Sequence, residues 1–163
     1  MSLDPTLLDA LDSSSLRTFF ALRVDFIASE TSVNLIDGSG FINLTVDGEA
    51  TEFRGHDPIF GTIASITGIE EKIASEAPSV SVTLLPASNA AFGEINAPEN
   101  QGSIVRIWWG LVNEVTGAVV GSPELLWYGR LDTVQSNVAE HAQTCELITV
   151  SGFDRLFVKY RPG

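Results

Sequence analysis

Cysteine is almost absent from this chain of 163 residues, and basic residues are few. The single cysteine, Cys145, excludes an intramolecular disulfide framework and a zinc cluster built from cysteines. Nine lysines and arginines stand against 21 aspartates and glutamates, which gives a formal net charge of −12. Because so acidic a surface repels phosphate backbones, we expect no nucleic-acid partner.

Long apolar runs are also missing. The most apolar stretch, residues 104–112, is interrupted by Arg106, and no run approaches the length of a membrane-spanning helix. The first residues are acidic rather than basic, unlike a targeting signal. We therefore expect a protein that folds in the cytoplasm and does not insert into membranes.

What the chain does have is enough apolar material for a core, since 44% of its residues are hydrophobic and only 18% are charged. Its length fits a single β domain over residues 1–163, with a helical arm at 1–16 and a short closing helix and tail at 151–163. In the arm, Asp4 and Pro5 suit the start of a helix. Its apolar stripe is made by Leu7, Leu8 and Leu11.

The clearest pattern in the chain is the strict alternation of residues 79–85. Val80, Val82 and Leu84 fall on one side of an extended chain, with serine and threonine on the other. Similar alternation predicts further strands at 19–28, 33–36, 41–46, 49–54, 105–111, 125–131 and 144–150. We also assign 61–73 as a strand, because its glycines and β-branched residues outweigh a helix-like spacing of isoleucines.

Turn signals connect these strands. The glycine-rich loop 37–40 predicts a β-hairpin between 33–36 and 41–46, and Asp47-Gly48 predicts a second tight turn into 49–54. Residues 86–92 suggest one helical turn, and 96–102 a surface loop. The predicted fold is all-β: an antiparallel barrel or sandwich of about eight strands with a short N-terminal helix.

The side of each strand that carries the apolar residues predicts which residues share the core. The expected members are Leu22, Val24, Leu44, Val82, Ile107 and Leu125, with Trp109 and Trp127 beside them. Phe19, Trp108 and Tyr128 have the opposite parity and would form an exposed apolar patch, which usually marks a partner surface. The candidate protein interface is therefore Leu7, Leu8, Leu11, Phe19, Trp108 and Tyr128.

Few residues suggest catalysis. In 55–58, His56 beside Asp57 is the most enzyme-like feature, but the segment is typical of a turn, and His141 lies in a polar run. Cys145 lies in a predicted strand, where we expect it to be a small buried residue. Carboxylates are frequent enough to assemble a glycosidase-type pair, yet most fall at strand ends and turns. We expect no catalytic residues, no metal and no cofactor.

The order of the segments resembles a family of proteins. The resemblance rests on spaced glycine, aromatic and acidic positions that span nearly the whole chain. These positions are the strand 17–26, Phe41, Asp47-Gly48, Phe53-Arg54-Gly55, the alternating 80–84, 102–110 with Trp108-Trp109-Gly110, Thr116-Gly117, 126–132 and Asp154-Arg155-Leu156. This layout resembles tail proteins of bacteriophages, prophages and gene transfer agents of proteobacteria, of the tail-tip or baseplate hub type.

The resemblance implies a virion structural protein, made in the bacterial cytoplasm and located in the virion tail. It implies protein–protein contact with other tail proteins and with copies of itself, in a ring or stack, and no catalytic residues. The alternative that the residues leave open is a carbohydrate-binding or glycan-hydrolysing β-domain, in which exposed aromatic side chains and a carboxylate do the work.

Overall fold

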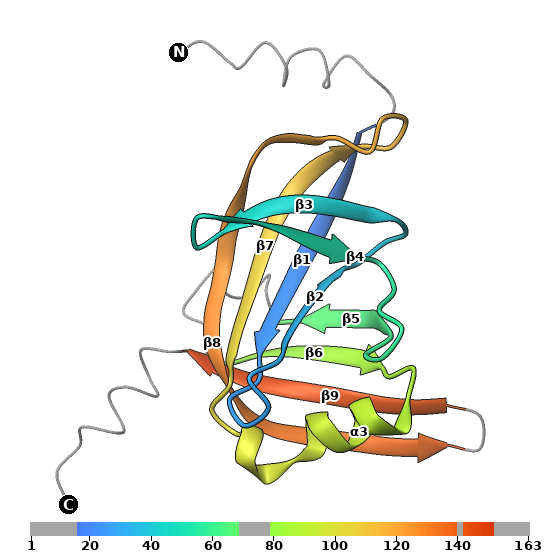
Figure 1. Ribbon diagram of the computed structural model, residues 1–163, viewed down its shortest axis with the longest axis vertical. Coiled ribbons are helices and arrows are strands. Elements are labelled where there is room, and N and C mark those ends of the chain that lie inside the picture. Colours follow the sequence, from blue (N-terminus) through green and yellow to red (C-terminus); the bar gives the residue numbers. More distant parts are fainter. Residues whose placement is uncertain (1–15, 69–78, 140–141, 152–163) are drawn as a thin grey trace, which may run out of the picture.

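The computed structural model describes residues 16–68, 79–139 and 142–151. Residues 1–15 of the predicted arm, 152–163 of the predicted closing helix and tail, and 69–73 of the predicted strand 61–73 lie outside the described residues. Leu16 and Ser151, which were assigned to the arm and the closing helix, instead belong to strands. Figure 1 shows the described elements. They are β1 (Leu16–Asp25), β2 (Ser32–Ile36), β3 (Phe41–Val46), β4 (Glu49–Arg54), β5 (Thr62–Thr67), β6 (Ser79–Leu85), α3 (Asn89–Asn96), the 3-10 helix η1 (Pro98–Asn100), β7 (Ile104–Asn113), β8 (Val119–Ala139) and β9 (Ala142–Ser151).

The nine described strands belong to one sheet, in the order β3-β4-β2-β1-β7-β8-β9-β6-β5. Neighbouring strands are antiparallel, except that β2 and β4 are parallel. The 21-residue strand β8 pairs first with β7 and then with β9, and its register shifts between Leu131 and Thr133 near the changeover. The sheet therefore folds over at β8, and its two halves face each other as in a sandwich (Figure 1).

The predicted all-β class is confirmed, and the architecture is sandwich-like rather than a closed barrel. The last strand of the sheet, β5, contacts β2 but does not pair with it, so the sheet stays open there. Where one helical turn was expected, α3 runs for eight residues. Ser88 caps its first turn by accepting a hydrogen bond from the Ala91 backbone N–H at 3.1 Å.

The main core lies between the two halves of the sheet. Its buried members come from β1, β2, β6, β7, β8, β9 and α3, and include Leu22, Val24, Leu35, Val80, Val82, Leu84, Ile95, Val105, Ile107, Trp127, Cys145 and Leu147. Four of the six residues that parity predicted for the core, Leu22, Val24, Val82 and Ile107, meet here. The alternation along these strands therefore predicted the main core well.

A second cluster lies on the opposite, outer face of β1 and β7. The β3–β4 hairpin crosses this face, as Figure 1 shows, and covers it. The buried members of the second cluster are Phe19, Ala21, Ile36, Ile42, Leu44, Val46, Phe53 and Val112. Both faces of β1 are therefore buried along part of its length. Asp47 and Gly48 both have positive φ, at 52° and 84°, as the predicted tight turn between β3 and β4 requires.

Three expectations about these strands are wrong. The predicted hairpin between 33–36 and 41–46 does not form, because β2 pairs with β1 and β4 while β3 pairs with β4. The loop 37–40 instead carries the chain across to the outer face. Leu44 is buried, but in the second cluster. Leu125 is 46% exposed rather than buried, since a register shift between β7 and β8 brings it opposite Trp108 on the outer face.

Candidate functional site

An apolar patch lies on the outer face of β7 and β8, beside the β3–β4 hairpin. Tyr128 is 47% exposed and is paired with Arg106, and Leu125 is paired with Trp108. Because Arg106 and Trp108 are two residues apart on β7, their cross-strand partners share the same face. We call the set of Trp108, Leu125 and Tyr128 the β8 patch. It unites two predicted interface residues with one that was expected in the core.

Trp108 is the half-buried edge of this patch. Its ring meets that of Phe53 edge-on, with centroids 5.8 Å apart, and the guanidinium carbon of Arg106 lies 5.5 Å from the Trp108 ring centroid. These contacts fix the side chain between the hairpin and the open surface. Trp108 was expected to be exposed, and the structure places only part of it at the surface.

Phe19 was expected in the same exposed patch, and this expectation is wrong. Only 1% of its surface is exposed, and it belongs to the second cluster. The physical reason is its partner Gly110, which has no side chain: a Cβ there would come within 2.7 Å of the Phe19 ring. The ring fills that space under the hairpin. Leu7, Leu8 and Leu11 lie outside the described residues.

The other two tryptophans were expected in the core. Trp127 is 2% exposed and lies in the main core, so its prediction is confirmed. Its indole covers the backbone of Gly129, where a Cβ would collide with the ring. Trp109 is only partly buried and belongs to neither cluster, so its predicted place in the core is wrong.

Charged residues from β1, from β7 and from the turn between β3 and β4 meet beside the β8 patch. Arg106 donates to Asp47 at 3.0 Å through Nη1 and to Asp25 at 3.1 Å through Nη2. Arg23 donates to the other oxygen of Asp25 at 3.0 Å, and Ser32 donates to the same oxygen. This ionic cluster ties the tip of the β3–β4 hairpin to the sheet beneath it.

The ionic cluster shifts the pKa values of two of its members, Arg106 and Asp25. Burial opposes the charge of Arg106, but the hydrogen bonds and charges of Asp47 and Asp25 outweigh burial, so the pKa of Arg106 is raised. Burial likewise acts to raise the pKa of Asp25, but the Ser32 hydrogen bond and the charges of Arg23 and Arg106 outweigh it. The pKa of Asp25 is therefore lowered, and both groups are charged at neutral pH. The cluster is a set of matched ion pairs, a structural arrangement rather than a poised acid or base.

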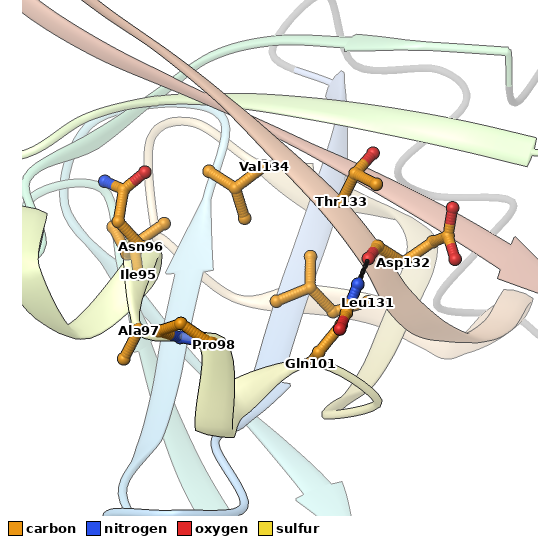
Figure 2. Close-up of a pocket in the computed structure, with 9 residues that line it drawn as sticks. All are labelled: Ile95, Asn96, Ala97, Pro98, Gln101, Leu131, Asp132, Thr133 and Val134. Atoms are coloured by element: carbon orange, nitrogen blue, oxygen red, sulfur yellow. Dashed lines mark hydrogen bonds between the residues drawn. The ribbon is translucent and has the colours of Figure 1, made fainter.

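A cavity of about 250 Å³ lies between the α3–η1 segment and the bend of β8. Figure 2 shows its lining: Ile95, Asn96, Ala97, Pro98, Gln101, Leu131, Asp132, Thr133 and Val134. The Gln101 side chain, part of this lining, donates to the backbone oxygen of Asp132 at 2.5 Å. The lining holds one carboxylate, Asp132, whereas glycoside hydrolysis uses two that flank the scissile bond.

The residues that were considered for catalysis or metal binding lie in a turn, in a strand or outside the described residues. Asp57 accepts the backbone N–H groups of Ile59 and Phe60 at 2.8 and 2.9 Å, which confirms that 55–58 forms a turn, and His56 lies exposed on it. Cys145 is fully buried in β9, as expected. His141 lies outside the described residues. Within the described part of the chain, no group of three or more His, Cys, Asp and Glu side chains is placed to hold a metal ion.

Sequence reasoning missed the ionic cluster and the role of Asn100. Asn100, expected in a surface loop, is 1% exposed and accepts the Ala28 backbone N–H at 2.9 Å while donating to Glu94. Its partners are 72 and 6 residues away in the sequence, so only the assembled fold brings them together. The one usable signal was the alternation of Arg23 and Asp25 on a strand, which places both on one face.

The sequence matches no protein-family model, and no curated protein matches it significantly. Across 16–68, 79–139 and 142–151, no helix is long and apolar enough to cross a membrane.

Proposed function

We propose that this chain is a structural protein of a phage-like tail, a component of the tail tip or baseplate hub that acts through protein–protein assembly. Support comes from the resemblance of its segment order to such proteins and from an all-β, sandwich-like fold with an exposed apolar patch. The partners proposed are other tail proteins and copies of the chain itself, with the virion tail as its location.

The observation that carries the proposal is the exposure of the β8 patch. Leu125 and Tyr128 are 46% and 47% exposed, yet both lie on a long strand held by β7. A rigid strand presents apolar side chains without losing much conformational freedom on binding, which favours a protein interface. In a symmetric ring the same patch is used by every copy, so a weak contact is repeated around the circle.

The proposal is tested by self-association. The net charge of −12 opposes contact between copies, so we expect association that is weak in dilute solution and strengthens with salt, which screens like charges. The double variant Leu125→Ser/Tyr128→Ser is expected to associate at least about tenfold more weakly, because two apolar side chains no longer leave water. Light scattering over a range of protein and salt concentrations measures this.

Val115→Ser is the matched control, because Val115 is 79% exposed in the β7–β8 turn and lies outside the β8 patch. It is expected to associate like the wild type. A wild-type protein that stays monomeric under every condition, or a Val115→Ser effect as large as that of the double variant, contradicts assembly through this patch. Gene neighbourhood gives an independent check, since tape-measure and major tail genes beside this one are expected.

A further inference from the structure

The β3 strand is an edge strand without the usual protection. Within the described part of the sheet it pairs only with β4, over six residue pairs and without a bulge. Its sequence, Phe-Ile-Asn-Leu-Thr-Val, contains no charge and no proline. Natural edge strands are usually blunted by charges, prolines, bulges or a cover, because their free backbone groups otherwise pair with other chains.

The opposite edge of the sheet shows such protection. β5 pairs only with β6 among the described strands, but its register is broken by an irregularity between Ile63 and Ser65. Each edge strand also contacts one further strand, β5 against β2 and β3 against β8, so the break in register is what distinguishes the two edges. The chain therefore blunts one of its two edges and leaves the other regular, and this difference requires an explanation.

The register of the β3–β4 hairpin shows which backbone groups of β3 are free. In a two-residue hairpin the pair that flanks the turn is hydrogen-bonded, and such pairs alternate with pairs that are not. Val46 flanks the turn, and the Gly55 N–H donates to the Gly40 carbonyl at 2.8 Å, as this alternation requires. The N–H and C=O groups of Phe41, Asn43 and Thr45 therefore point away from β4, toward the free side.

Two hollows follow this free side of β3. One, of about 320 Å³, lies at the Phe41 end and is lined by Phe41, Ile42, Val112, Asn113 and neighbouring residues. The other, of about 400 Å³, lies at the Thr45 end and is lined by Asn43, Leu44, Thr45, Trp108, Val119 and the 121–123 segment. The two hollows adjoin, because Val112 of the first pairs with Val119 of the second. Together they form a groove lined by β7 and, at the Thr45 end, also by β8. The β3–β4 hairpin crosses these strands in Figure 1.

The charges around the groove indicate what it accepts. At the Phe41 end, Arg17 and Glu114 neutralise each other at 3.1 Å. At the Thr45 end stands Glu49, opposite Val46; it is exposed and forms no ion pair with a described residue. The whole chain carries a net charge of −12, which adds to this negative end. An extended occupant with an apolar or neutral middle and a basic end complements this groove, whereas an acidic one is repelled.

We propose that the β3 groove, defined as the free side of β3 with the two hollows beside it, binds an extended, net-basic segment of a partner protein as an added antiparallel or parallel strand. Backbone hydrogen bonds to Phe41, Asn43 and Thr45 supply the affinity. Side chains that point into the groove pack on Val112 and Val119, which supplies the specificity. The groove borders the β8 patch at Trp108 but includes neither Leu125 nor Tyr128. The Leu125→Ser/Tyr128→Ser variant therefore tests the proposed function, and the experiments below test the groove separately.

The test uses the full chain and a peptide of five alternating valines and threonines flanked by lysines as the probe. NMR titration of the isotopically labelled protein is expected to shift the signals of 41–46 and leave those of β5 unchanged. The same peptide with N-methyl groups on alternate amides keeps its side chains but loses donors, so it is expected to bind at least about tenfold more weakly. A peptide with glutamate in place of lysine is expected to bind more weakly than the lysine form.

Variants of Asn43 provide the matched pair on the protein side. Asn43→Pro removes an outward N–H that the β3–β4 ladder does not use, and proline is tolerated at such edge positions. It is expected to weaken peptide binding by at least about tenfold, whereas Asn43→Thr, which keeps the N–H, stays within about twofold of the wild type. Thr45→Pro is a second test of the same kind if Asn43→Pro does not fold.

Four results overturn the proposal, three with the peptide and one with the protein alone. The three with the peptide are equal binding of the N-methylated peptide, unchanged binding by both proline variants, and peptide-induced shifts at β5 instead of β3. A fourth is a change in the signals of 41–46 when the wild-type protein alone is concentrated, since that identifies a second copy of this chain as the occupant.

Discussion

The inner and outer faces of the layer formed by β1, β7 and the first part of β8 are built differently. On the inner face, Leu22, Ile107 and Trp127 are sealed beneath the other half of the sheet, with at most 2% of any of them exposed. The outer face is covered only where the β3–β4 hairpin crosses it. Beyond the hairpin it carries an ionic cluster and then the exposed β8 patch.

This difference separates a face that stabilises the fold from one that is available for contact. The hairpin is joined to the rest of the sheet by one parallel pairing, Leu35 with Arg54, and by the Arg106–Asp47 ion pair at its tip. The second cluster is consequently smaller and closer to solvent than the main core. We expect the outer face to tolerate substitution better, and the following predictions test that.

The largest expected effect is in the main core. Leu22→Ala removes a side chain that is fully buried between the two halves of the sheet, so we expect the free energy of unfolding to fall by about 3–5 kcal/mol. Leu44→Ala, the same change in the second cluster, is expected to cost about 2 kcal/mol, because the hairpin can settle into the space. Denaturant unfolding of both variants measures this, and equal losses contradict the distinction between the two clusters.

A smaller effect is expected in the ionic cluster. Asp25→Asn leaves Arg23 and Arg106 without their shared carboxylate, so we expect a loss of about 1–3 kcal/mol at neutral pH. Because the folded-state pKa of Asp25 is lowered, its contribution is present above the ordinary value of 3.8 and is lost as the pH falls through the lowered value.

The unfolding free energy of the wild type should therefore fall more steeply than that of Asp25→Asn as the pH drops below about 3.8. Denaturant unfolding at several pH values from neutral downward shows this as two curves that converge in acid. Parallel curves over the whole range indicate that Asp25 is not stabilised by its arginine partners. Glu52→Gln, at an exposed ion pair with Arg54, is the control and should change little.

The smallest effect is expected on the exposed part of the outer face. Leu125→Ala should change the free energy of unfolding by no more than about 0.5 kcal/mol, since the side chain is 46% exposed. The sequence alone assigns this residue to the core, where the same substitution would lower the free energy of unfolding by several kcal/mol. If denaturant unfolding shows a loss above about 2 kcal/mol, Leu125 is buried in the core and is not part of the exposed β8 patch.

The sequence predicted the strands because alternation depends on each strand alone. Val80, Val82 and Leu84 show it clearly, since β6 has a single buried face. It failed for Phe19, because β1 is covered on both sides and the second cover, the β3–β4 hairpin, arrives from a distant segment. Which strands pair is equally non-local: the Asp47-Gly48 turn was readable, whereas the pairing of β4 with β2 was not.

The candidate site was predictable only in part, and for the same reason. Tyr128 and Trp108 were identified from their parity, and they do share one face. Leu125 was missed because the register shift between Ile107 and Trp108 moves it to the outer side, and no sequence signal marks that shift. The ionic cluster joins Arg106 to partners 81 and 59 residues away, which only the folded sheet brings together.

The central claim is that the open part of the outer face is the assembly surface. Hydrogen–deuterium exchange of the wild-type protein at increasing concentration, at a salt level that screens the charge of −12, tests it most directly. We predict that backbone amides of 124–128 in β8 exchange more slowly as concentration rises, while those of 62–67 in β5 do not change. Exchange at 124–128 that is independent of concentration, or slowing that is equal at 62–67, would contradict assembly through the β8 patch.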